Sequence, residues 1–166
     1  LLRESFYLLL VGISLYLIMI LMSYDRNDAG WSHSGGFNEI QNAGGYAGAW
    51  LADLLLYLFG VSAWWWIAFF LSMIAWSYRR IDSGGIFDKQ SIVFSIGGFL
   101  LLLVASSGLE SLRFYTISAS LPLAPGGILG NAISYFFSKV FGAIGATLLL
   151  LTLIAVGFSQ FTGLSW

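Results

Sequence analysis

Two charged side chains inside apolar segments are the residues with the most chemical potential in this sequence. Asp53 lies in the run WLADLLLYLFG, and Lys139 lies in a second short apolar run, SYFFSKVFG. A carboxylate is costly in hydrocarbon, so Asp53 should face protein or, on a helix lying in the interface, lipid headgroups. Lys139 can extend its charge to the interface. The opposite charges allow a pair between these segments or between subunits, and they are the residues that a small transporter would use.

The other polar candidates predict structure rather than catalysis. His33 is the only histidine, and it lies in a loop of serines and glycines where it has no partner for metal or proton chemistry. Glu110 and Arg113 have the i, i+3 spacing of a surface pair on a helix. There is no cysteine, and the sequence has no nucleotide-binding, zinc-protease or nucleophile-elbow motif. We therefore predict no catalytic residue, no metal site and no cofactor in this chain.

Composition predicts that these residues are positioned by an all-α integral membrane domain. Of the 166 residues, 58% are hydrophobic and 9% are charged, with a mean hydropathy of +0.86, whereas a soluble domain has about 25% charged residues. Seven Lys and Arg against eight Asp and Glu leave no basic field for a nucleic acid. Any contact with DNA must therefore come from another part of a longer protein.

The apolar stretches predict a single transmembrane domain over 1–166 with four spans and two short helices. The stretch 44–78 would extend about 50 Å as one helix, which is too long for an upright span. Gly60 and, in the last stretch, Gly142 are the expected breaks, since glycine weakens a helix. The short helices would lie in the interface or re-enter the bilayer. The predicted spans are 6–24, 61–77, 91–108 and 143–158, and the short helices are 47–59 and 131–141.

The positive-inside bias places both termini in the cytoplasm. Inside lie Arg3, Arg79, Arg80 and Lys89, and outside lie Arg26, Arg113 and Lys139. Aromatic residues at both ends of the second span are typical of interfacial belts, although stacking on a ligand is an alternative for the tryptophan triplet. The predicted interfacial anchors are Trp64, Trp65, Trp66, Trp76, Arg79 and Arg80.

An internal repeat aligns GGYAGAWLADLLLYLFG, from Gly44, with GGILGNAISYFFSKVFG, 82 residues later. The offset contains two spans, so the copies would have the same orientation; chance matching in a glycine-rich apolar sequence is the alternative. A stripe of small and polar residues on the second copy is typical of helix packing. The matched glycines are Gly44, Gly45, Gly48 and Gly60 with Gly126, Gly127, Gly130 and Gly142, and the stripe is Asn131, Ser134, Ser138, Gly142 and Gly145.

Several segments together resemble the N-terminal four-span domain of FtsK/SpoIIIE-type bacterial DNA translocases. They are the opening LLRE, the loop SYDRNDAGWS, the glycine-delimited LADLLLYLFG, the later PGGILGN and the closing TGLSW. The resemblance covers essentially the whole chain, which begins at Leu1 and ends without a polar tail, so we expect a fragment of a longer protein.

The resemblance implies a membrane anchor for an ATP-driven double-stranded DNA motor at the division septum of the bacterial inner membrane. It implies three kinds of partner: lipid, copies of the same chain assembled as a hexamer, and other divisome proteins. It also implies that ATP, Mg²⁺ and DNA are bound only by the absent C-terminal motor. Contacts with partners outside the membrane would involve Asp25, Asp28 and Glu39. Two alternatives stay open: a DNA-conducting channel, against which the absence of a basic stripe counts, and a small transporter with parallel repeats.

Overall fold

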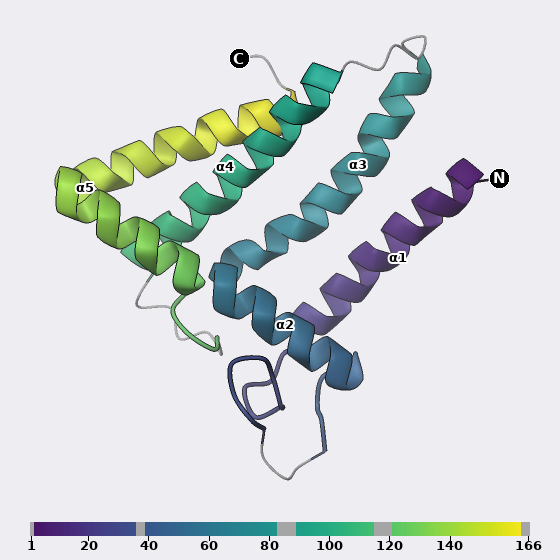
Figure 1. Ribbon diagram of the computed structural model, residues 1–166, viewed down its shortest axis with the longest axis horizontal. Helices are drawn as coiled ribbons and strands as arrows, with labels where there is room; N and C mark the ends of the chain where they lie inside the picture. The colour runs from purple at the N-terminus through teal and green to yellow at the C-terminus, as the bar shows by residue number, and fades with distance from the viewer. Residues whose placement is uncertain (1, 36–38, 83–88, 115–120, 164–166) are drawn as a thin grey trace.

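Helices account for the regular structure of the described residues, which form no strand (Figure 1). The computed structural model describes residues 2–35, 39–82, 89–114 and 121–163. Continuous apolar sequence favours helices in this chain because every backbone N–H and C=O group must be bonded within its own segment in lipid.

The first half of the chain contains α1, α2, η1 and α3. The helix α1 spans Leu2–Met22, and a loop leads from it to α2, Gly45–Phe59. The α2 helix ends where Gly60 has φ 61°, a left-handed conformation that glycine adopts without a steric penalty. A short 3₁₀ helix, η1 (Gly60–Trp64), follows and continues into α3, Trp65–Asp82.

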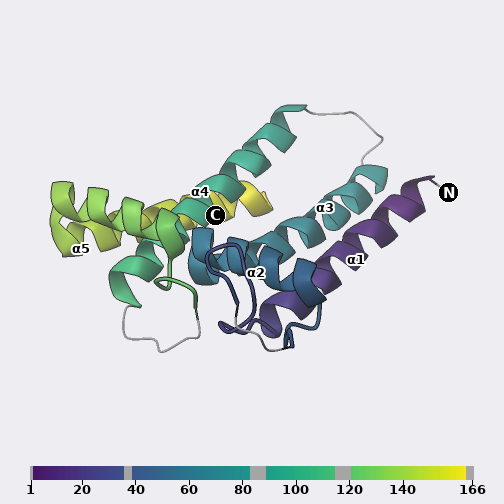
Figure 2. The ribbon, with the colours of Figure 1, turned by 60° about the horizontal axis from the view of Figure 1, so that its bottom comes forward.

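The second half contains α4, Lys89–Arg113, and α5, Gly127–Thr162. The α5 helix has a sharp bend because Gly142 has φ 68° and ψ 171°, which is not helical. In Figure 1 the bend is the left-hand extremity of the molecule. Two views show α1, α2 and α3 grouped together, with α5 extending away from them beyond α4 (Figures 1 and 2).

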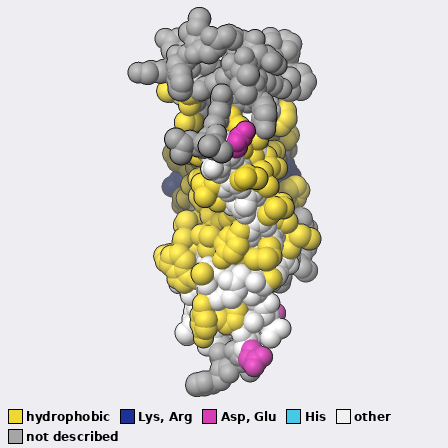
Figure 3. Space-filling model, turned by 90° about the vertical axis from the view of Figure 1, so that its right-hand side faces the viewer, with side chains coloured by type: hydrophobic (Ala, Val, Ile, Leu, Met, Phe, Trp, Pro, Cys, Tyr) yellow, Lys and Arg dark blue, Asp and Glu magenta, His cyan; other side chains and the backbone are white. Residues whose placement is uncertain are grey.

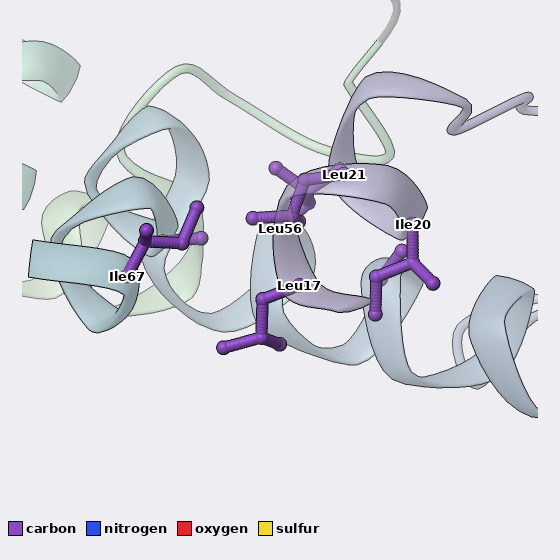
Figure 4. Close-up of a cluster of buried hydrophobic side chains, with 7 residues drawn as sticks. Leu17, Ile20, Leu21, Leu56 and Ile67 are labelled. Atoms are coloured by element: carbon purple, nitrogen blue, oxygen red, sulfur yellow. The ribbon is translucent and has the colours of Figure 1, made fainter. Parts of the chain in front are cut away.

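Apolar side chains between the helices form two buried clusters. In the first, side chains from α1, α2 and α3 meet around Leu17, Ile20, Leu56 and Ile67 (Figure 4). The second is centred on Phe99 of α4, which packs against Phe161 of α5 with ring centroids 5.6 Å apart.

The helices α4 and α5 pack closely through small residues. A Cβ atom added at Gly157 would lie 2.8 Å from the backbone nitrogen of Leu102, and one at Gly98 would lie 2.5 Å from that of Phe161. Close backbone approach at glycine is a common way to pack helices in a membrane, where lipid removes the hydrophobic drive for association. This packing joins α4 and the second part of α5 along their length.

Four helical segments are long and apolar enough to cross a membrane, as predicted. They are Glu4–Met22, Gly45–Trp76, Ile92–Arg113 and Gly127–Thr162. The face of the molecule seen in Figure 3 has a broad band of hydrophobic side chains, with acidic side chains near either end. The start of α1 and the end of α5 lie toward the same end of the molecule (Figure 1), as an even number of spans requires.

Several helix bounds differ from those predicted from the apolar runs. The helix α4 continues to Arg113 rather than ending at Gly108, because Glu110 is turned inward and does not stop the helix. The helix α2 and the part of α5 before Gly142 occupy the region of the predicted short helices, whose existence as separate elements stays a prediction. Whether these segments lie flat in the interface or re-enter the bilayer stays a prediction.

Candidate functional site

Asp53 lies at the centre of a buried polar cluster at the end of the molecule opposite the termini. Its side chain, on α2, is 0% exposed. The hydroxyl of Tyr24, just beyond α1, donates to Asp53 Oδ1 over 3.0 Å, and the backbone N–H of Ser32 donates to Oδ2 over 2.6 Å. The backbone of Gly30 also packs against Asp53, because a Cβ atom added at Gly30 would lie only 2.6 Å from the Asp53 carboxyl carbon. The expectation that Asp53 touches lipid headgroups is therefore wrong, since the loop covers it.

His33 belongs to the same cluster, although its position in a serine and glycine loop predicted no role for it. Its Nδ1 lies 3.7 Å from Asp53 Oδ1 and 3.0 Å from the hydroxyl of Ser32. Its Nε2 is buried and has no hydrogen-bond partner. The side chain is 30% exposed, so His33 is a half-buried neighbour of a carboxylate rather than a solvated loop residue.

A second buried carboxylate, that of Asp28, holds together the loop between α1 and α2. Asp28 is buried and accepts hydrogen bonds from the backbone N–H groups of Gln41 and Asn42, both over 2.8 Å. Asn42 in turn donates to the carbonyl oxygen of Ile20, over 2.9 Å. The loop is thus fixed to the end of α1 by hydrogen bonds between side chains and backbone groups. Of its other acidic residues, Glu39 is exposed and Asp25 is half-buried.

Burial and Asp53 both change the acidity of Tyr24. Removal of the phenol from water is the larger cause, and the neighbouring carboxylate is the second; both raise the pKa of Tyr24 above its ordinary value. The neutral hydroxyl is therefore kept as the donor to Asp53. This bond connects the end of α1 to α2.

Glu110 of α4 is the centre of another buried polar cluster, which lies at the chain break at Gly60. It is 7% exposed. Its carboxylate accepts hydrogen bonds from the backbone N–H of Ser62, over 3.0 Å, and from the Ser62 hydroxyl, over 2.7 Å. The same hydroxyl lies 2.6 Å from that of Ser106. Glu110 therefore caps the first turn after the break, where N–H groups have no partner within their own helix.

The expected surface pair of Glu110 and Arg113 is wrong. Glu110 points inward to Ser62, while Arg113 donates from Nε to the hydroxyl of Thr147 on α5, over 2.9 Å. The two residues are adjacent on one helix but serve different contacts. Spacing along a helix identifies possible neighbours, whereas the tertiary packing decides which of them bond.

The predicted interfacial tryptophans have different surroundings. Trp66 is part of an aromatic cluster inside the bundle, with its ring centroid 5.2 Å from that of Phe99, and its Nε1 has no hydrogen-bond partner. Trp76 packs edge-on against Phe161, with centroids 5.7 Å apart. Trp64 is exposed and Trp65 half-buried, so an interfacial role stays a prediction for them. The side chains of Arg79 and Arg80 lie outside the described part of the structure.

Lys139 does not meet Asp53 within the chain. It lies on the part of α5 before the bend, where its Nζ is 5.8 Å from the ring centroid of Tyr135. Together with Ser134 and Ser138 these residues line an open hollow of about 450 Å³. Ser134 and Ser138 bond back to their own helix, and Asn131 is exposed. In the stripe, Asn131 and Gly142 are exposed and the other residues are half-buried, and its role in helix packing stays a prediction.

The repeated glycines have similar φ angles in the two copies. Gly44 and Gly126 have φ −87° and −95°. Gly45 and Gly127 have φ 62° and 63°, and Gly60 and Gly142 have φ 61° and 68°. Gly48 and Gly130 each donate to the carbonyl oxygen four residues earlier, over 3.1 and 2.9 Å. The φ angles and the first hydrogen bonds therefore agree between the two copies, which favours a repeat over chance, whereas ψ at the break differs, −138° at Gly60 and 171° at Gly142.

Both carboxylate clusters serve architecture, since neither presents a nucleophile, base or ligand set to an open cavity. The described residues bring together no three metal-ligating side chains. Sequence reasoning missed Glu110, Asp28 and His33. One signal was present for Glu110: Ser62 lies two residues after Gly60, the glycine break in an apolar run, and such a break needs a polar cap.

Comparison with known proteins gives the family. The model of the 4TM region of DNA translocase FtsK/SpoIIIE matches residues 1–166, the whole chain. DNA translocase FtsK 2 of Ralstonia nicotianae is 39% identical over 171 residues, covering 100% of this chain and 22% of that protein. DNA translocase FtsK of Shewanella oneidensis is 36% identical over 155 residues, covering 91% of the chain and 16% of the relative. DNA translocase FtsK of Pseudomonas syringae pv. syringae is 34% identical over 172 residues, covering 99% and 21%.

The chain thus spans about a fifth of the length of these curated relatives. No solved structure matches it. A match over every residue, together with four helices suited to cross a membrane, agrees with the resemblance seen in the loop and glycine motifs. The chain belongs to the family of 4TM regions of the DNA translocases FtsK and SpoIIIE.

Proposed function

We propose that this chain is the membrane anchor and assembly module of an ATP-driven double-stranded DNA translocase, which it holds at the division septum. The observation that carries the proposal is the whole-chain match to the 4TM region of FtsK/SpoIIIE translocases. Four apolar helices supply the anchor. The chain has no nucleotide-binding motif, so the motor, with ATP, Mg²⁺ and DNA, belongs to the remainder of a longer protein.

The proposed orientation places both termini in the cytoplasm of a bacterium, with the chain in the inner membrane. An even number of spans keeps the termini on one side, and Arg79 and Arg80 directly after a span favour that side as the inside. A motor that uses cytosolic ATP and DNA requires this arrangement. The loop closed by Asp53 and Asp28 then lies outside, where it can contact other divisome proteins.

The alternative of a small transporter receives no support from the geometry. Asp53 is sealed under a loop by Tyr24 and Ser32, and Lys139 lies on the outward face of α5. A DNA-conducting channel has no more support, because the described helices present no continuous basic face. The membrane anchor is therefore the function that the geometry supports best. Its immediate partners in this proposal are lipid and copies of the same chain, assembled as a hexamer.

A fusion experiment tests the proposal. The chain is fused at its C-terminus to a reporter that fluoresces only in the cytoplasm, and dividing cells are imaged. A bright band at midcell is the expected result. A dark but membrane-inserted fusion would refute the orientation, and a bright, uniform cell outline would refute septal targeting by this domain. As a matched control, Lys139→Gln removes a lysine from the outward face of α5 and should not change the result.

A further inference from the structure

The two copies of the repeat contact each other inside the chain, through a glycine of each. A Cβ atom at Gly60 would clash with the carbonyl group of Pro125, and one at Gly127 would lie 2.6 Å from the carbonyl oxygen of Leu58. The N–H of Val61 donates to the Pro125 carbonyl oxygen over 2.7 Å. The break after α2 is thus covered by the glycine pair that begins α5.

The equivalent positions of the other two glycines are open. Gly142, which corresponds to Gly60, and Gly45, which corresponds to Gly127, would each accept a Cβ atom with no heavy atom within 4 Å. Nearby side chains are also exposed: Ile144, close to Gly142, and Tyr46, next to Gly45, are each 74% exposed. Each copy therefore has one half of the same interface unoccupied.

The open halves lie at opposite ends of the molecule. In Figure 1 the bend of α5 is at the far left, whereas α2 begins at the lower right. The α5 helix is also the span with the least burial, since 17% of its most apolar window is buried, against 44% for α4. Complementary surfaces at opposite ends of one chain produce head-to-tail contacts, which close into rings when the rotation permits.

We propose that a second copy of this chain occupies the bend of α5, and that its Ala43–Gly45 segment covers Gly142 as Pro125–Gly127 covers Gly60. The internal interface is the template for the contact between subunits. Because the offset is 82 residues, Ala43 takes the place of Pro125 and Ala143 the place of Val61. This inference rests on the proposed assembly of the domain with copies of itself and identifies the surface that would mediate it.

Cysteine cross-linking tests the contact without background, since the chain has no cysteine. Two differently tagged copies are produced in one membrane, one with Ala43→Cys and the other with Ala143→Cys. Both alanines are exposed, and the template places their backbones in hydrogen-bond contact. The matched control replaces the second variant with Ala155→Cys, an exposed alanine on the same helix, about 18 Å further on.

The expected result is about tenfold more mixed disulfide with Ala143→Cys than with Ala155→Cys, because a disulfide forms only over a short Cα separation. Ala143→Trp should lower the proportion of oligomer in native electrophoresis, whereas Ala155→Trp should not. Equal cross-linking of the two pairs would overturn the proposed contact, as would a disulfide between two copies of Ala143→Cys. If the chain is oligomeric but the two pairs cross-link equally, only the proposed contact is refuted and the proposed self-assembly stands. A purely monomeric chain refutes both.

Discussion

Glu110 should contribute measurably to stability through the single serine that it caps. In Glu110→Ala the backbone N–H of Ser62 loses its acceptor, and an unsatisfied buried donor costs about 1–3 kcal/mol. The Ser62 hydroxyl loses one bond but keeps Ser106, at a cost of about 0.5–1.5 kcal/mol. We therefore expect a loss of about 1.5–4.5 kcal/mol in the free energy of unfolding.

Glu110→Gln is the matched control because its amide oxygen still accepts from the Ser62 N–H, so we expect a loss of less than about 1 kcal/mol. The assay is unfolding of the chain in mixed detergent micelles with increasing SDS, followed by tryptophan fluorescence, to which Trp66 in the nearby aromatic cluster contributes. The reasoning would be refuted if Glu110→Ala were as stable as the parent chain. It would also fail if the glutamine variant lost as much as the alanine variant.

Three further results are expected. Asp53→Ala should leave the helix content by circular dichroism unchanged but speed proteolysis near Ser32, whose N–H loses its acceptor; unchanged cleavage would contradict the loop closure. Since the folded chain raises the pKa of Tyr24 above its ordinary 10.0, stability should be full below about pH 10 and fall above it, as the unfolded phenol ionises first; Tyr24→Phe should abolish this slope in a pH series of unfolding curves. Gly157→Leu should separate α4 from α5 and lower the detergent melting temperature by several degrees, whereas a melting temperature equal to the parent's would argue against close backbone packing there.

The all-helical membrane architecture was predictable because it depends on local properties. The length of an apolar run and the position of Gly60 or Gly142 are visible in the sequence, and both glycines have the expected non-helical conformation. The family was also predictable, since its motifs are short and glycine-delimited. These features are specified within one segment and do not depend on which surfaces meet.

The polar clusters could not be predicted in the same way. Glu110 and Ser62 are 48 residues apart, and Asp53 and Tyr24 are 29 apart, so only the packing of whole helices brings them together. A helical position such as Glu110 can face lipid, loop or protein, and the i, i+3 spacing to Arg113 favoured the wrong partner. His33 likewise gains its neighbour only when the loop folds over Asp53.

The capping of the Gly60 break by residues that occur much later in the chain has a consequence for the order of synthesis. When η1 and α3 enter the membrane, Glu110 and Pro125, which supply the acceptors for Ser62 and Val61, have not yet reached it. The first half can insert but cannot complete its own break until the second half arrives. By contrast, α4 and α5 are neighbours in sequence and can pair as they emerge. The chain should therefore mature from its later helices back to its earlier ones.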